Sequence, residues 1–275
     1  MAQELSDRVA VITGGGRGIG RAVAEALASA GAAVAVLART QSEIGDTARA
    51  IEGARGRALA YECDVLDTAA LARVAASVSE DLGAVDLLVN NAGTGAAIGP
   101  TWEVDAELWW RDVEVVIRGG FNACRAFVPG MIKRRSGRVV NVTSRAGAMA
   151  VPYHTAYSCS RAAIFQLTEG LAGELAVHSV LAFALTPGTV KTALTRNILE
   201  SDAGQRWLPR LKELLASGTT WVEPAAVGKA VVAIARGDAD ALAGRWLHTT
   251  DDFAALVASA QDIEANDRRA LRLRS

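Results

Sequence analysis

Cysteine is scarce in this sequence. There are only three cysteines, Cys63, Cys124 and Cys159, and they stand far apart in the chain. An odd number at wide spacing argues against a disulfide framework and against the paired ligands of a zinc site. We therefore expect small buried cysteines, no bound metal, and a protein of a reducing compartment, the cytoplasm.

An excess of charge of either sign is also missing. The 29 Lys+Arg residues balance 30 Asp+Glu residues, which leaves a formal net charge of −1. Nucleic acids and anionic membranes favour basic surfaces, so neither is expected as the main partner. No apolar run approaches the roughly 18 residues that span a bilayer, and Met1 to Arg8 lack the apolar core of a signal peptide. The expected partner is a small-molecule substrate.

Hydrophobic residues, in contrast, make up 51% of the 275 residues, enough for a large core. Short apolar segments alternate with segments whose apolar residues recur at helical spacing. This alternation predicts βαβ crossovers and a parallel sheet covered by helices on both faces. The expected strands are Arg8–Thr13, Ala33–Leu37, Arg57–Tyr61, Val85–Asn90, Arg138–Val142 and Ser179–Leu185. The expected helices between them are Ile19–Ser29, Glu43–Glu52, Thr68–Asp81, Asp105–Lys133 and Thr155–Val177.

The pattern indicates one α/β domain, residues 1–250, followed by a tail, residues 251–275. Within the domain, a helical stretch at Thr189–Gly218 predicts a substrate lid over residues 189–220. Glu223–Arg236 is expected to be a helix, Arg245–His248 a last strand, and Asp251–Arg268 a helix of the tail. Ligands of parallel sheets bind beyond the carboxyl ends of the strands, so the residues just after each strand are the candidate site.

A glycine-rich segment directly follows the first expected strand. It reads Thr13-Gly14-Gly15-Gly16-Arg17-Gly18-Ile19-Gly20, and a helix begins within it. Glycines permit a tight turn and close approach of phosphate to the backbone, and a helix N-terminus offers free N–H groups. Strand, loop and helix in this order predict a dinucleotide site at Gly14, Arg17, Gly18, Ile19 and Gly20.

The second expected strand ends in Leu37-Ala38-Arg39-Thr40. A carboxylate at position 38 would hold the ribose 2′-hydroxyl of NAD, but Ala38 is neutral. Arg39 and Arg17 instead offer two guanidinium groups, which suit a 2′-phosphate. We therefore expect NADP(H) as the cofactor. The alternative is that both arginines are solvated surface residues.

Polar and small residues follow the next two expected strands. Asp64, with Val65 beside it, is placed to accept a hydrogen bond from adenine, or else it caps a turn. Asn90, Ala92 and Gly93 come after the following strand, where small residues let a cofactor cross the sheet edge. The alternative there is ordinary turn chemistry.

Together, these motifs resemble the short-chain dehydrogenase/reductase family. The resemblance runs from about Leu5 to about Leu247 and rests on Thr13-Gly14-x3-Gly18-x-Gly20, Asp64, Asn90-Asn91-Ala92-Gly93, Ser144, Tyr157 and Pro187-Gly188-x-Val190-x-Thr192. It implies a Rossmann-like, doubly wound parallel sheet with strand order 3-2-1-4-5-6-7. It also implies a homodimer or homotetramer built through the long fourth and fifth helices.

The resemblance further implies three catalytic residues. In the family, a serine thirteen residues before a tyrosine binds the substrate carbonyl, the tyrosine transfers the proton, and a lysine four residues later holds the nicotinamide ribose. Ser144 and Tyr157 stand at this separation, but position 161 is Arg161. A guanidinium can bind ribose hydroxyls and favour tyrosinate, yet it does not release a proton near neutrality. The alternative is that Arg161 turns outward and pairs with an acid.

A second departure from the family lies in the fourth expected helix. Aligning Arg118-Gly119 with the family motif places Val116 where the family has an asparagine that holds a water for the proton path. The Val116 side chain cannot bind water by hydrogen bonds. His154, three residues before Tyr157, is a candidate additional acid, although a lone histidine in a loop more often serves packing.

After the sixth expected strand, the resemblance implies that the nicotinamide end of the cofactor is bound by Pro187, Gly188, Val190 and Thr192. An apolar stripe then follows in the lid. With Ala148–Tyr153 it predicts an apolar substrate pocket. The apolar residues considered are Leu194, Ile198, Trp207, Leu208, Leu211, Trp102 and Trp109. The alternative for the tryptophans is that they belong to the core or to a subunit interface.

The motifs favour an NADP(H)-dependent oxidoreductase that interconverts a ketone and an alcohol on an apolar small molecule. Tyr157 would act as the acid, Ser144 would polarise the carbonyl, and Arg161 would orient the ribose. Because of Arg161 and Val116, two alternatives stay open. One is a non-redox enzyme such as an isomerase, dehydratase or cyclase, and the other is a protein that binds NADP(H) without turnover.

Overall fold

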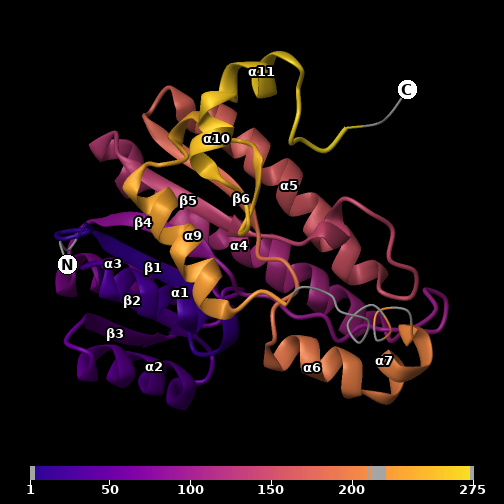
Figure 1. The fold of residues 1–275 in the computed structure, drawn as a ribbon. Helices are drawn as coiled ribbons and strands as arrows, with labels where there is room; N and C mark the ends of the chain where they lie inside the picture. Colours follow the sequence, from indigo (N-terminus) through magenta and orange to yellow (C-terminus); the bar gives the residue numbers. More distant parts are fainter. Residues whose placement is uncertain (1–3, 210, 212, 214–220, 273–275) are drawn as a thin grey trace.

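The fold is a seven-stranded parallel sheet between two layers of helices (Figure 1). The computed structural model describes residues 4–209, 211, 213 and 221–272. The strand order is β3-β2-β1-β4-β5-β6-β7, which confirms the predicted doubly wound α/β fold. The strands are β1 Val9–Thr13, β2 Ala33–Ala38, β3 Arg57–Glu62, β4 Val85–Asn90, β5 Gly137–Val142, β6 Val180–Thr186 and β7 Trp246–His248.

The helices are α1 Gly18–Ser29, α2 Gln41–Gly53, α3 Thr68–Asp81, α4 Ala106–Arg134, α5 Thr155–Ala176, α6 Ala193–Glu200, α7 Asp202–Trp207, α9 Pro224–Arg236, α10 Phe253–Ala258 and α11 Ala260–Ala265. Two short 3-10 turns, Arg145–Gly147 and Asp240–Leu242, complete the described helical elements. Helices α1, α2 and α9 cover one face of the sheet, and α3, α4 and α5 cover the other.

The apolar strands explain this double layer. In β1, Ala10 and Ile12 join the core beneath α1, α2 and α9, whereas Val9 and Val11 join the core beneath α3, α4 and α5. Side chains alternate along a strand, so a strand that is apolar throughout requires cover on both faces. All five residues of β1 are buried, as this arrangement demands.

The lid and the tail are each divided into short helices. The predicted lid contains two short helices, α6 and α7, because the Ser201 hydroxyl accepts a hydrogen bond from the Gly204 N–H and starts a new helix. Residues 210, 212 and 214–220 of the predicted lid lie outside the described residues. The single tail helix predicted over Asp251–Arg268 was wrong, since the chain forms α10 and α11 with Ser259 between them.

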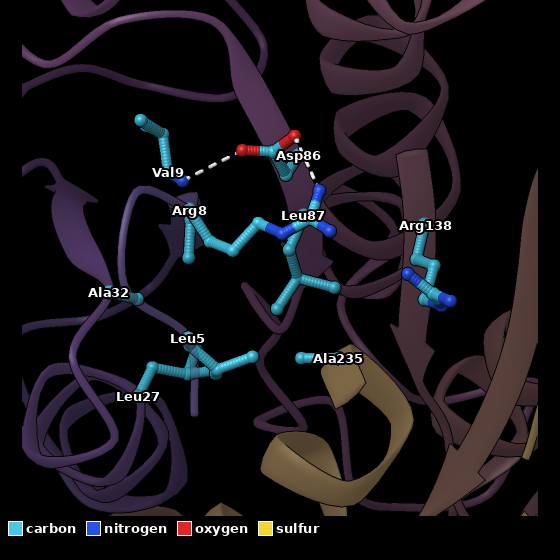
Figure 2. A pocket seen from close by; sticks show the side chains of 10 residues that line it. Leu5, Arg8, Val9, Leu27, Ala32, Asp86, Leu87, Arg138 and Ala235 are labelled. Carbon is cyan, nitrogen blue, oxygen red and sulfur yellow. Dashed lines mark hydrogen bonds and ion pairs between the residues drawn. The ribbon is translucent and has the colours of Figure 1, made fainter. Parts of the chain in front are cut away.

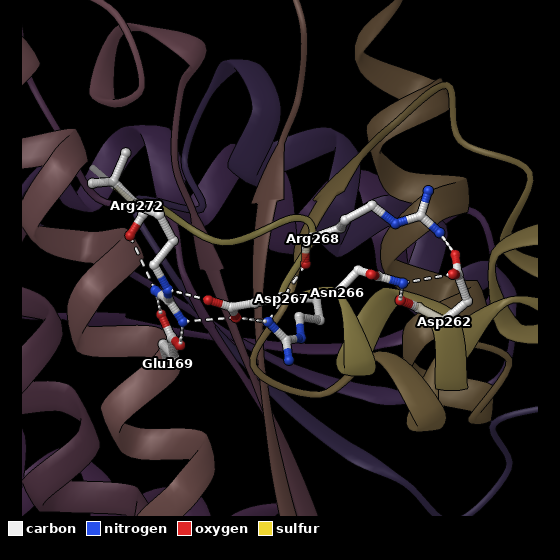
Figure 3. A network of polar contacts seen from close by, with 8 residues as sticks. Glu169, Asp262, Asn266, Asp267, Arg268 and Arg272 are labelled. Atoms are coloured by element: carbon white, nitrogen blue, oxygen red, sulfur yellow. Dashed lines mark hydrogen bonds and ion pairs between the residues drawn. The ribbon is translucent and has the colours of Figure 1, made fainter. Parts of the chain in front are cut away.

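Ion pairs join the end of the tail to helix α5 (Figure 3). Arg272 pairs with Glu169 of α5 and with Asp267, and Asp267 also accepts a hydrogen bond from Arg245 at 2.9 Å. The Trp246 N–H of β7 donates to the Arg269 carbonyl at 2.8 Å. The tail therefore lies along the last strand.

Two further expectations meet the structure here. Cys63 and Cys124 are buried as predicted, but Cys159 is exposed, because its position on α5 faces away from the sheet. Among the described residues, no helix combines the length and apolarity needed to cross a membrane.

Candidate active site

The loops after β1 and β4 meet at the carboxyl edge of the sheet. The Thr13 hydroxyl oxygen accepts hydrogen bonds from the backbone N–H groups of Asn91 and Ala92, each at 3.1 Å. Gly14 has a φ of +65°, and a Cβ on Gly20 would collide with the Gly14 carbonyl oxygen. Glycine is therefore required for the close packing of this loop.

The start of α1 is open toward this edge. Its N-cap residue, Arg17, is exposed, and within the described residues no side chain caps the helix and no acid lies in its first turn. The backbone N–H groups there are free to bind an anion. Gly18 has a φ of +55° and faces Thr192, while Ile19 packs against the core. The arrangement fits a dinucleotide phosphate.

Arg39 and Asp64 lie together beyond β2 and β3. The Asp64 carboxylate lies 3.1 Å from Arg111 and 3.9 Å from Arg39, and it accepts the Leu66 N–H at 3.0 Å. Burial would raise the pKa of Asp64, but the hydrogen bonds from Leu66 and Arg111 and the charges of the two arginines hold it below its ordinary value. Asp64 is thus an ionised acceptor at the sheet edge, and it also shapes a turn.

The predicted cofactor residues Val65 and Asn90 make contacts inside the protein. The Val65 side chain packs against Gly119 of α4, where a Cβ would lie 2.5 Å from it, and its carbonyl accepts a hydrogen bond from Asn122. The Asn90 amide donates to Asn141 of β5 at 2.9 Å. These two side chains hold the sheet and α4 together, which fixes the loops that follow them.

Arg161 points inward. Only 5% of its surface is exposed, and Nη1 donates to the Val142 carbonyl at the end of β5 at 3.1 Å. A Cβ on Gly93 would lie 2.5 Å from Arg161 Nη2 and 3.5 Å from Val116 Cγ2. The alternative of an outward Arg161 paired with an acid is wrong for this structure. Its buried Nε has no hydrogen-bond partner among the described residues.

Tyr157 lies between this guanidinium and His154. The Arg161 guanidinium carbon lies 4.8 Å from the centre of the Tyr157 ring. On α5, Tyr157 is one turn before Arg161, which explains the contact. The predicted partner Ser144 follows β5, is partly exposed, and its hydroxyl oxygen accepts the Ala146 N–H at 3.2 Å. Ser144 lies just beyond the carboxyl end of β5, as predicted, and Tyr157 lies in the first turn of α5.

The segment after β6 closes the site from the other side. Gly188 has a φ of +80°, and a Cβ there would lie 2.8 Å from Val222 and 3.3 Å from His248. It follows Pro187, which ends the strand. Val190 is buried and forms a bridge with Val222, and the Thr192 hydroxyl caps α6 by accepting the Thr195 N–H at 3.2 Å. The backbone here is fixed before the lid begins.

Side chains of α6 and α7 pack near the segment that carries Tyr157. Tyr153, whose φ is +64°, packs on Trp207 of α7 with ring centres 4.9 Å apart. Ile198 of α6 reaches the space beside Gly95 and Tyr157. Trp102 is 82% exposed and donates to the Glu103 carboxylate, so it is not a core residue, and its place in the pocket stays a prediction. Trp109 instead donates to the Thr155 hydroxyl at 2.9 Å and ties α4 to the start of α5.

Two cavities lie away from Tyr157. The one in Figure 2, at the opposite edge of the sheet around Arg8 and Asp86, has a volume of only about 10 Å³, room for about one water. A larger cavity of about 380 Å³ lies beside α6, lined by Lys191, Thr192, Thr195, Arg196, Leu199, Glu200 and Trp221. The first is too small for a substrate, and the second lies next to the predicted nicotinamide contact Thr192.

Two polar residues of this region were missed from the sequence. Asp112 is a buried carboxylate on α4, and Arg111 is the partner of Asp64. A signal for Asp112 existed, because it lies four residues before Val116 in the apolar stripe of α4. Arg111 had none, since charged residues on an exposed helix face are common.

Sequence comparison agrees with this geometry. A family model described as short chain dehydrogenase matches residues 8–203. The chain belongs to the short-chain dehydrogenase family. It is therefore a dehydrogenase-type oxidoreductase.

Individual members of the family support the assignment. A short-chain dehydrogenase of Pseudocercospora fijiensis is 35% identical over 265 residues, which cover 94% of this chain and 85% of the relative. A putative NAD(P)-dependent gluconate 5-dehydrogenase from Beutenbergia cavernae, solved with NADP, is 32% identical with a TM-score of 0.81, covering 93% of this chain and 100% of that one. A variant of actinorhodin polyketide ketoreductase, solved with NADPH, is 30% identical with a TM-score of 0.80, covering 90% and 97%.

Proposed function

We propose that this short-chain dehydrogenase uses NADP(H) to interconvert a ketone and an alcohol on an apolar small molecule. The observation that carries the proposal is the inward Arg161 guanidinium, 4.8 Å from the Tyr157 ring, at the edge where the glycine loop opens. Tyr157 donates the proton to the carbonyl oxygen, and Ser144 polarises that oxygen with its hydroxyl. Arg161 stabilises the tyrosinate left behind and binds the ribose hydroxyls. The nicotinamide, when bound, supplies or accepts the hydride.

The preference for NADP(H) rests on charge. Arg17 and Arg39 are both exposed at the mouth of the glycine loop, with side chains 67% and 64% accessible. Their only carboxylate neighbours within ion-pair distance in the described chain are Glu43 at 3.5 Å and Asp64 at 3.9 Å, both loose contacts. Two similar structures carry NADP or NADPH, although a relative from Sphingomonas sp. is named an NAD(+) enzyme. The arginines of this chain favour the phosphorylated cofactor.

The same residues hold the rest of the cofactor. The open N-terminus of α1, with Gly14, Gly18 and Gly20, fits the pyrophosphate. Ala92 and Gly93 follow the end of β4, where the Arg161 guanidinium packs directly against Gly93. Gly188, Val190 and Thr192 are assigned to the nicotinamide end. The substrate then lies against Tyr153, Ile198 and Trp207, apolar side chains that match a ketone without charge.

The outer face of α4 supports a proposal on the assembly. Trp110 and Phe121 of α4 are 58% and 48% exposed, large apolar side chains that a subunit contact would cover. We infer a homodimer or homotetramer through these helices. The dehydrogenase domain spans residues 1–250, the tail is an extension of it, and three unpaired cysteines suit the cytoplasm.

Tyr157→Phe tests the function. The variant loses the hydroxyl alone, so the rate of NADPH consumption with a responsive ketone should fall by about a hundredfold or more. Its NADPH dissociation constant, measured by titration, should stay within about twofold. Undiminished turnover would refute the role of Tyr157. Conversion of substrate with no change in the reduced nicotinamide would instead indicate a non-redox enzyme, and NADPH binding without any turnover a binding protein.

A further inference from the structure

The loop between β4 and α4 lies against the reacting residues. Gly93 of this loop backs the Arg161 guanidinium, and a Cβ on Gly95 would lie 3.1 Å from the Tyr157 ring and 3.3 Å from His154 Nε2. Neither position has room for a larger residue unless a catalytic side chain moves. This loop therefore limits the space in which Tyr157 and Arg161 can lie.

His154 connects this loop to Tyr157. Its imidazole is 3% exposed and stacks on the Tyr157 ring, with ring centres 4.7 Å apart and an angle of 8° between the planes. Its Nε2 lies 3.1 Å from the Gly95 carbonyl oxygen. A carbonyl only accepts hydrogen bonds, so Nε2 carries the hydrogen and the tautomer is fixed.

Asp112 anchors the same loop from the side of α4. Its carboxylate is 1% exposed, and Oδ2 accepts the Ala97 N–H at 2.8 Å. The second oxygen, Oδ1, is buried without a hydrogen-bond partner in the described part of the chain. Burying a carboxylate with an unpaired oxygen is costly. An apolar residue at this place would avoid that cost but would leave the buried Ala97 N–H without its acceptor, so the carboxylate serves to hold this loop.

We propose that His154 is a positioning residue for Tyr157, held in place by the Gly95 carbonyl and, through the loop, by Asp112. The proposal rests on the proposed function, because it assigns a role relative to the tyrosine hydroxyl. Arg161 contacts the Tyr157 ring from the next turn of α5, and His154 stacks on it from the start of the helix. A proton donor misplaced by even about 1 Å loses much of its effect, so fixing the ring plane contributes to turnover.

The charges around His154 favour this role over that of an additional acid. Burial lowers the pKa of His154, and the Arg161 charge lowers it further, against the hydrogen bond to Gly95 and the charge of Asp112. The imidazole is therefore neutral near pH 7. A neutral ring that already donates its N–H to a carbonyl has no proton to give to Tyr157.

Paired substitutions at position 154 test the proposal. His154→Phe keeps a ring for the stack but loses the donor to Gly95, whereas His154→Gln keeps a donor but loses the ring. Both variants are expected to lower kcat by about tenfold, because a proton donor that is no longer held in its orientation reacts more slowly. KM for the ketone and the NADPH dissociation constant should stay within about twofold. His178→Gln, near the far end of α5, is the matched control and should leave all three values unchanged.

Substitutions at Asp112 provide a second test of the proposal. Asp112→Asn retains an oxygen that can accept the Ala97 N–H, while Asp112→Ala removes it, so Asp112→Asn should keep at least about threefold more kcat than Asp112→Ala. Circular dichroism and thermal unfolding check that each variant folds. If Asp112→Ala does not fold, the two His154 variants still decide the question.

The outcomes separate the two proposals. If the unmodified protein reduces no ketone with NADPH, the proposed function fails and this inference falls with it. If the unmodified protein turns over and both folded His154 variants keep kcat within twofold, only the positioning role is refuted. Losses confined to KM or to NADPH binding would likewise refute it.

Discussion

Replacing Arg161 by glutamine removes a buried positive charge from beside Tyr157. The guanidinium carbon lies 4.8 Å from the ring centre, and at an effective dielectric constant of about 20 two unit charges at that distance interact by about 3 kcal/mol. The negative charge develops on Tyr157 only as the proton leaves, so this energy acts on the transition state. We expect Arg161→Gln to lower kcat on the order of a hundredfold.

The matched variant is Arg161→Lys. Glutamine carries no charge, and its amide ends where Arg161 Nε lies, so it also loses the hydrogen bond that Nη1 donates to the Val142 carbonyl at 3.1 Å. Lysine keeps the charge and loses the planar fork. We expect Arg161→Lys to retain at least about tenfold more kcat than Arg161→Gln, measured by NADPH consumption at saturating ketone. If Arg161→Gln turned over within about threefold of the unmodified protein, the charge argument would be refuted.

Three further predictions concern cofactor choice, pH and packing. Arg39→Ala should raise KM for NADPH roughly tenfold and leave KM for NADH unchanged, since one charge-assisted hydrogen bond contributes about 1.5–3 kcal/mol. Arg49→Ala is the control. Equal effects on the KM of both cofactors would contradict a contact between Arg39 and the 2′-phosphate. Burial lowers the pKa of His154 below its ordinary value of 6.5, so the unfolded chain binds the proton first as pH falls and stability declines below about pH 6.5. His154→Phe should therefore reduce the loss of Tm between pH 7 and pH 5, and an unchanged slope would count against a buried neutral imidazole. Phe183 of β6 is fully buried, so Phe183→Ala should cost about 3–5 kcal/mol in urea unfolding, whereas a cost below about 1 kcal/mol would contradict the packing.

Most of the sheet was predictable because its central strands are short and mainly apolar. The prediction at Val85–Asn90 coincides with β4, because an apolar segment of this length is typical of a strand and too short for most helices. The tail was less predictable. Its apolar residues Phe253 and Ile263 pack on the core that α1 and α9 cover, and that packing decides where α10 and α11 end. Local sequence carries little information about such a contact.

For the site, motif spacing placed Tyr157 and Arg161 one helical turn apart, and this much follows from α-helix geometry. The sequence left open which way Arg161 points. That direction depends on the space above Gly93 and on the Val142 carbonyl, groups far from Arg161 in the sequence. The stack of His154 on Tyr157 depends likewise on the position of the Gly95 carbonyl, which only the folded loop defines.

Arg161 and Val116 form one packing unit with Gly93. A Cβ on Gly93 would lie within 2.5 Å of Arg161 Nη2 and 3.5 Å of Val116 Cγ2, so the guanidinium occupies the corner between the loop and α4. Val116 is 4% exposed and presents only methyl groups to that corner. A polar side chain at position 116 would need a partner there, whereas Arg161 already donates to Val142 from its own position. Because the two side chains share this space, substitutions at 116 and 161 should not add independently, and the kcat of the double variant compared with the two single variants measures their coupling.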